Sequence, residues 1–136
     1  MLLNAVPALP VKDIGRSATF FHHQLGFTIA FQESGYAVLR RDAVEIHLWA
    51  STDESWRKRV GSEKDGGSLI VSGAESFLAG TASCRIEVRD VEGLYRHIQP
   101  LGILHPQAPL HNTDFGTREF AVTDPDNNLV TFFERV

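Results

Sequence analysis

Two parts of the chain carry the same succession of apolar and polar positions. Val11–Ile14 is echoed by Val88–Val91, 77 positions later (88 − 11). Each copy follows a short apolar stretch and places an aspartate, a favoured N-cap, before apolar residues at helical spacing. Each predicted helix ends at Leu-Gly followed by an apolar residue, first at Leu25–Phe27 and again at Leu101–Ile103. Because glycine readily adopts the left-handed conformation that closes a helix, we expect the same helix twice.

The segments after each predicted helix repeat as well. Tyr36–Val38 is similar to Phe120–Val122, and Ile46–Trp49 is similar to Val130–Phe133, both 84 positions apart (120 − 36 and 130 − 46). The larger offset places about seven additional residues in a Pro-rich loop before Phe115. The predicted strands span residues 4–9, 28–33, 36–40, 43–50, 82–89, 103–106, 117–123 and 128–134.

These patterns predict an α+β fold in a single domain, residues 1–136, built from two βαβββ modules with curved, antiparallel-rich sheets. The first module spans residues 4–50 and the second spans residues 82–136. The connecting segment, residues 51–81, is rich in Ser, Gly and charge and carries a short helical pattern at Glu54–Val60. A four-stranded sheet with one helix leaves its other face uncovered. Two such sheets are therefore expected to enclose a cavity, within one chain or across a two-fold dimer.

Composition narrows the classes of partner. The 136 residues include 13 Lys+Arg and 17 Asp+Glu, a formal net charge of −4, which argues against nucleic acid. No apolar run reaches the roughly 18–20 residues of a membrane helix, and the first residues lack a basic leader pattern. The single cysteine, Cys84, excludes an internal disulfide framework and is predicted to be buried on the helix side of its strand. We therefore expect a cytoplasmic protein that contacts neither membrane nor nucleic acid.

Several short motifs resemble one known family in their order along the chain. They are Ala5–Leu9, Asp13–Ile14, Phe20–Phe21, Leu25–Phe27, Glu45–Leu48, Phe115–Phe120 and Asp124–Leu129. The chain resembles the vicinal oxygen chelate superfamily (glyoxalase/bleomycin resistance/dioxygenase) and, within it, the bleomycin-resistance proteins. The resemblance covers residues 4–50 and 82–135. It implies a homodimer built with exchange of the N-terminal strand, and stoichiometric sequestration of a drug in a groove between two subunits.

The resemblance also identifies the positions where enzymes of this superfamily hold a metal ion. These positions carry Val6, His47, Ser83 and Thr131 here. Only His47 has a suitable ligand atom, and Glu45 is the one candidate for a second, whereas open catalytic sites use about three protein ligands. We therefore expect no metal, no cofactor and no catalytic residue. The alternative is a metal-dependent glyoxalase- or dioxygenase-like enzyme that uses His47 and Glu45 with ligands from the other subunit or from a loop.

The groove implied by the resemblance is lined by aromatic and acidic side chains. Strand alternation puts Glu45, His47 and Trp49 on one face. Phe31, Tyr36 and Phe115 match family positions at the groove or its mouth, and Glu119 would add a second acidic acceptor besides Glu45. The predicted ligand-binding residues are Phe31, Tyr36, Glu45, His47, Trp49, Phe115 and Glu119. Flat rings and carboxylates suit a cationic or aromatic antibiotic. For the strand aromatics and for His47, a place in the core or the dimer interface is the alternative. A module that carries a metabolite to a partner is a third possible function.

Overall fold

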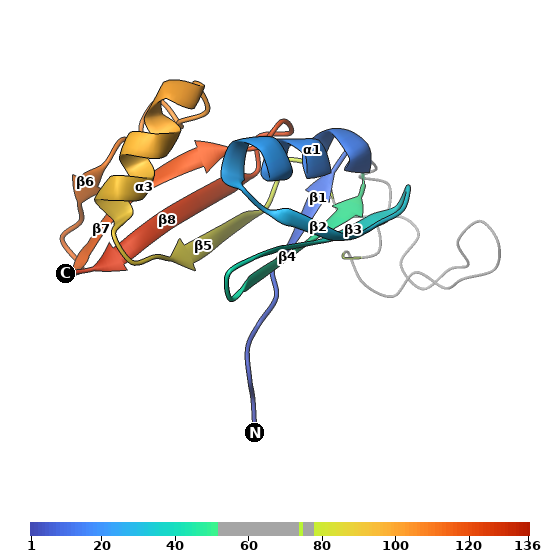
Figure 1. Ribbon diagram of the computed structural model, residues 1–136, viewed down its shortest axis with the longest axis horizontal. Coiled ribbons are helices and arrows are strands. Elements are labelled where there is room, and N and C mark those ends of the chain that lie inside the picture. Colours follow the sequence, from blue (N-terminus) through green and yellow to red (C-terminus); the bar gives the residue numbers. More distant parts are fainter. Residues whose placement is uncertain (52–73, 75–77) are drawn as a thin grey trace.

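The computed structural model describes residues 1–51, 74 and 78–136, which form two modules, each with one sheet and one α-helix (Figure 1). The first module contains β1 (Ala8–Val11), α1 (Ile14–Leu25), β2 (Thr28–Gln32), β3 (Tyr36–Arg41) and β4 (Val44–Ala50). The second contains β5 (Ser83–Glu87), α3 (Val91–Ile98), the 3-10 helix η2 (Gln99–Leu101), β6 (His111–Asn112), β7 (Thr117–Thr123) and β8 (Leu129–Arg135). This arrangement confirms the predicted α+β fold of two βαβββ modules. The helical pattern at residues 54–60 lies outside the described residues.

The two sheets share one topology. Their strand orders are β1-β4-β3-β2 and β5-β8-β7-β6, with a parallel pair at β1–β4 and β5–β8 and antiparallel pairs elsewhere. Helix α1 packs on the first sheet and α3 on the second (Figure 1). Among the described residues, no helix is long and apolar enough to cross a membrane.

A continuous apolar core lies between each sheet and its helix. Alternate strand residues such as Leu39 and Leu48 are fully buried, as is Phe21 of α1. In the second module Phe120 and Val130 take the corresponding places. The side chains between them point the other way, to a second face of each sheet on which no helix of the described residues packs; we call it the helix-free face.

The helix ends follow the predicted signals. The Asp13 carboxylate accepts a hydrogen bond from the Arg16 N–H at 3.0 Å, and Asp90 accepts one from the Gly93 N–H at 3.1 Å. Gly26 closes α1 in the left-handed region, with φ of 72°. The predicted aspartate N-caps and the first glycine cap are confirmed.

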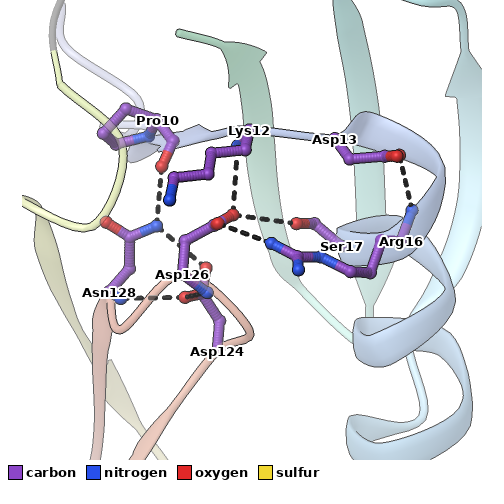
Figure 2. Close-up of polar contacts among 8 residues, drawn as sticks. All are labelled: Pro10, Lys12, Asp13, Arg16, Ser17, Asp124, Asp126 and Asn128. Carbon is purple, nitrogen blue, oxygen red and sulfur yellow. Dashed lines mark hydrogen bonds and ion pairs between the residues drawn. The ribbon is translucent and has the colours of Figure 1, made fainter. Parts of the chain in front are cut away.

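A turn of the second module is bonded to the first module (Figure 2). The Asp126 carboxylate accepts hydrogen bonds from the Lys12 N–H at 3.1 Å and from Arg16 Nη2 at 2.6 Å. Asn128 Nδ2 donates to the Pro10 carbonyl at 2.8 Å. These contacts join the start of the first module to the β7–β8 turn, and we call them the inter-module latch.

Two predicted strands were wrong in their bounds. The first begins at Ala8 rather than at residue 4, because Pro7 has no N–H to continue the ladder with β4, although its carbonyl accepts from the His47 N–H. The segment predicted as a strand at 103–106 makes only one bridge, between Leu104 and Val122. Pro106 interrupts this segment, and the edge strand forms later, as β6.

The predicted equivalence between β3 and β7 was wrong by one residue. His47 pairs with Val38, and Thr131, 84 positions after His47, pairs with Ala121. Ala121 follows Val38 by 83 positions (121 − 38) rather than 84. The stretch from Ala121 to Thr131 (131 − 121 = 10) is therefore one residue longer than the stretch from Val38 to His47 (47 − 38 = 9). Because side chains alternate along a strand, Phe120 points to the core, whereas Tyr36 points to the helix-free face.

Candidate functional site

The helix-free face of the first sheet carries one hydrogen-bonded chain of side chains from β3 and β4. Tyr36 OH lies 3.2 Å from His47 Nδ1, and His47 Nε2 lies 2.7 Å from Glu45 Oε2. Arg40 Nε donates to Glu45 Oε1 at 2.8 Å. Since a carboxylate only accepts, Nε2 of His47 carries a proton and donates it to Glu45 in this hydrogen bond. Both oxygens of Glu45 are occupied within the chain.

These contacts also set the charge of Glu45. Hydrogen bonds from Arg40 and then from His47 lower the pKa of the Glu45 carboxyl below its ordinary value. Glu45 is therefore an anion at neutral pH that already has two donors. A cationic ligand would have to share it with them or replace one of them.

Aromatic rings continue this face toward the edge of the sheet. The Phe31 ring is half-exposed, and its centroid lies 6.0 Å from that of Tyr36. Tyr36 stands edge-on to His47 with centroids 5.3 Å apart, and Trp49 lies opposite Tyr36 in the β3–β4 ladder. The five residues predicted in the first module, Phe31, Tyr36, Glu45, His47 and Trp49, thus lie on neighbouring strands.

The helix-free face of the second sheet is centred on an ion pair between β5 and β7. Arg85 Nη2 lies 2.6 Å from Glu119 Oε2, which also accepts from Thr117 Oγ1 at 3.3 Å. The Arg85 guanidinium carbon lies 4.5 Å from the centroid of the Phe133 ring and 6.0 Å from that of Phe115. The predicted residues Glu119 and Phe115 are therefore connected through Arg85.

Neither Arg85 nor Phe133 is among the residues predicted from the sequence. Phe133 is the repeat counterpart of Trp49 at the offset of 84, so the duplication did carry a signal for it. Arg85 is the counterpart of Ala8 at the offset of 77. Ala8 pairs with His47 in the first parallel ladder, and Arg85 pairs with Thr131 in the second. Nothing in the pattern of an alternating strand distinguishes this arginine from a solvated one.

A cavity of about 290 Å³ adjoins the Arg85–Glu119 pair. Its polar lining is Arg85, His105, His111, Glu119 and Thr131. The Gln107 N–H donates to His105 Nδ1 at 3.1 Å, and His111 Nδ1 lies 2.7 Å from the Pro109 carbonyl. Two loop histidines therefore have their Nδ1 atoms engaged by backbone. The cavity extends the helix-free face under the Pro-rich loop.

A larger cavity, of about 660 Å³, lies apart from both helix-free faces. It is bounded by the β3–β4 hairpin at Arg41–Val44 and by α3 at Leu94 and His97. None of the seven predicted ligand-binding residues lines it. We therefore choose the helix-free faces as the candidate site for the chemistry of their side chains and not for the size of a cavity.

The positions that hold metal ions in related enzymes do not form a metal centre here. Of the predicted positions besides His47, Val6 precedes β1, Ser83 lies opposite Leu129 in the second parallel ladder, and Thr131 lies on β8. In residues 1–51, 74 and 78–136 no group of three or more His, Cys, Asp or Glu side chains is placed to hold a metal ion. A valine, a serine, a threonine and a single imidazole do not supply the ligands of a catalytic metal.

Cys84 lies in the core, as predicted. Burial, with the Asp124 charge as a smaller contribution, raises the pKa of its thiol from 9.0 to about 11. The thiolate, which is the nucleophile, is therefore scarce at neutral pH.

Comparison with known proteins gives one consistent family. The glyoxalase/bleomycin resistance protein/dioxygenase superfamily matches residues 5–132. Bleomycin resistance proteins of Geobacillus stearothermophilus and Staphylococcus aureus are each 51% identical to this chain over 135 residues, 99% of this chain and 98% of theirs. A bleomycin-binding protein from bleomycin-producing Streptomyces verticillus, solved with copper(II)-bleomycin, superposes with a TM-score of 0.70 at 26% identity. That match covers 97% of this chain and 95% of the other.

Proposed function

Because this chain belongs to the glyoxalase/bleomycin resistance/dioxygenase superfamily, we propose that it binds bleomycin and withholds the drug by stoichiometric sequestration. The observation that carries the proposal is the 51% identity to bleomycin resistance proteins along almost the whole chain. Binding without catalysis agrees with side chains that do not fit a catalytic metal. The single buried cysteine supports the cytoplasm as the compartment.

The proposed site uses both helix-free faces. Phe31 and Tyr36 on the first sheet and Phe115 in the turn before β7 offer ring faces for a planar heteroaromatic group. Phe115 is two-thirds exposed and Phe31 half-exposed, so both are available for contact. Glu45 and Glu119 add negative charge, which suits a ligand with a cationic group.

We further propose a homodimer whose groove lies between the first sheet of one subunit and the second sheet of the other. Met1, Leu2 and Leu3 are fully or almost fully exposed, and the chain before β1 runs away from both sheets (Figure 1). An exposed apolar segment of this kind favours a second copy as its partner, consistent with exchange of the N-terminal strand. Sedimentation should give a mass near twice 15.1 kDa, and a stable monomer would contradict this arrangement.

Calorimetric titration with bleomycin tests the proposal. We expect saturable binding with one drug molecule per chain, because two-fold symmetry generates two equal grooves. A change in tryptophan fluorescence should follow the same isotherm, since Trp49 lies on the proposed wall. No saturable binding up to about 1 mM bleomycin would overturn the proposed drug specificity.

A further inference from the structure

The Arg85 guanidinium already makes the contacts that a bound organic cation would make on the second sheet. It forms a 2.6 Å ion pair with Glu119 and lies 4.5 Å from the Phe133 ring centroid. Phe115 is the next ring, at 6.0 Å. A carboxylate flanked by aromatic faces is a favourable environment for a planar cation.

Glu45 and Glu119, the two acidic residues predicted as acceptors, differ in whether a carboxylate oxygen remains available to a ligand. At Glu45 both oxygens accept hydrogen bonds, from Arg40 and from His47. At Glu119 the contacts of Arg85 and Thr117 both fall on Oε2, and within the described part of the chain Oε1 accepts none. Glu119 also lines the 290 Å³ cavity. Of the two acids, Glu119 is the one with an oxygen for a ligand.

The pair is also asymmetric in exposure. The Glu119 side chain is 11% exposed, whereas that of Arg85 is 45% exposed. The carboxylate is fixed in the sheet, and the arginine is long and lies at its surface. A buried carboxylate is costly to leave unpaired, so Arg85 can leave readily only when another cation takes its place.

We propose that Arg85 is a displaceable internal cation that selects ligands bearing a planar cationic group, such as an aromatic amidine or guanidine. The ligand cation pairs with Glu119 and stacks on Phe133 and Phe115, while the Arg85 side chain moves to solvent. This inference rests on the proposed function only in placing the ligand on the Glu119 face. The competing arrangement keeps Arg85 in place as a donor to an anionic group of the ligand, and the two predict opposite effects of removing the arginine.

Benzamidine, a planar aromatic amidinium, is the test probe, with benzamide as its neutral counterpart. Calorimetry should compare the wild type with R85Q and with R135Q as the matched control. Arg135 also lies near Phe133, at 5.7 Å, but pairs with Glu87, so its removal changes the net charge equally without freeing Glu119. We expect R85Q to bind benzamidine about tenfold more tightly than the wild type, and R135Q to stay within about twofold.

Two further variants locate the effect. In R85Q/E119Q the gain for benzamidine should disappear, because the acceptor is gone. R85K keeps the charge but lacks the planar stack on Phe133, so we expect a gain smaller than that of R85Q. Benzamide should bind all variants equally weakly. Circular dichroism and thermal melting verify that each variant is folded.

A measurement on the unaltered protein does not depend on any variant folding. The Arg85 side-chain N–H resonance of the wild type should shift when benzamidine saturates the site, and the Arg135 resonance should stay unchanged. An unmoved Arg85 signal at saturation would overturn the proposal. Three calorimetric results would also overturn the proposal. They are weaker binding of benzamidine by R85Q than by the wild type, the same change in affinity for R85Q as for R135Q, and no binding of benzamidine to R85Q up to about 100 mM.

The titration of the wild type with bleomycin keeps the two claims separate. If bleomycin does not bind but the benzamidine pattern holds, the proposed drug is wrong and the displaceable arginine stands. If bleomycin binds and R85Q gains nothing for benzamidine, sequestration stands and the role of Arg85 is wrong.

Discussion

Arg16 and Asp126 are 110 residues apart in the chain, and their side chains form an ion pair at 2.6 Å in which the carboxylate is only 2% exposed. The pair joins α1 of the first module to the β7–β8 turn of the second (Figure 2). Asp124 holds the turn itself, because its Oδ1 accepts from the N–H groups of Asp126 and Asn128. The relative placement of the two helix-free faces therefore depends on a few polar contacts as well as on the core.

Replacing Asp126 tests how much the inter-module latch contributes. In Asp126→Asn an amide N–H₂ would face the Lys12 N–H and Arg16 donors, so we expect unfolding free energy to fall by about 2–3 kcal/mol. Urea unfolding measures the change. Asp42→Asn is the matched control, since the Asp42 side chain is 91% exposed and contacts Arg41 only at 3.9 Å. Its cost should be at most about 0.5 kcal/mol, and equal costs for the two variants would mean that the latch adds nothing.

Gly80 approaches the same turn closely. Its φ is +82°, and an added Cβ would lie 2.1 Å from the Asp126 carbonyl oxygen. Gly80→Ala should therefore lower the unfolding free energy by about 2 kcal/mol or more, through strain and displacement of the turn. At Gly35 an added Cβ meets nothing within 4 Å, so Gly35→Ala should change the unfolding free energy by no more than about 0.5 kcal/mol. Thermal unfolding of both variants gives the comparison, and a neutral Gly80→Ala would contradict the close approach.

The buried thiol of Cys84 should be unreactive in the folded protein. With its pKa raised to about 11 by burial, labelling by a disulfide reagent at pH 8 should be slow until denaturant is added. The neighbouring Ser83 is exposed, so an S83C/C84S variant should label rapidly without denaturant.

The raised pKa of Cys84 also makes stability depend on pH. The thiol is protonated in both states below its ordinary value of 9.0, so its contribution is then fully present. As pH rises from about 9 toward 11, the unfolded state loses its proton first, and unfolding free energy falls. In C84S the unfolding free energy should lack this part of its fall at alkaline pH. An identical decline in C84S would show that other groups cause it.

Removal of one exposed ring tests the proposed drug site. Phe115→Ala should weaken bleomycin binding about fivefold to tenfold, because a stacking surface is lost, with little effect on folding at a residue that is 66% exposed. Leu101→Ala, at another exposed apolar residue on η2, removes apolar surface away from both helix-free faces. Calorimetric titration of both variants with bleomycin should show a loss of affinity for Phe115→Ala and not for Leu101→Ala. Equal losses of affinity would exclude Phe115 from the site.

Much of the fold could be predicted from local signals along the chain. Asp13 and Asp90 cap helices, Gly26 ends one, and buried apolar residues alternate with polar ones, because capping and alternation involve neighbours in sequence. The same alternation placed Glu45, His47 and Trp49 on one face. What local signals could not give is that β1 begins only after Pro7, which lacks the N–H that would face β4, or that the stretch from Ala121 to Thr131 is one residue longer than that from Val38 to His47.

The sequence by itself determined the duplication, the helices with their N-caps, the family resemblance and the common face of Glu45, His47 and Trp49. Only the tertiary structure decided their partners. Arg85 reaches Glu119 across β8, and Arg16 reaches Asp126 across the module boundary. The physical reason is that an ion pair depends on which strands and turns become neighbours, and periodicity within a segment carries no information about that. The sequence therefore lists the charged residues of the candidate site. Whether a given charged side chain is already paired or can bind a ligand depends on the fold.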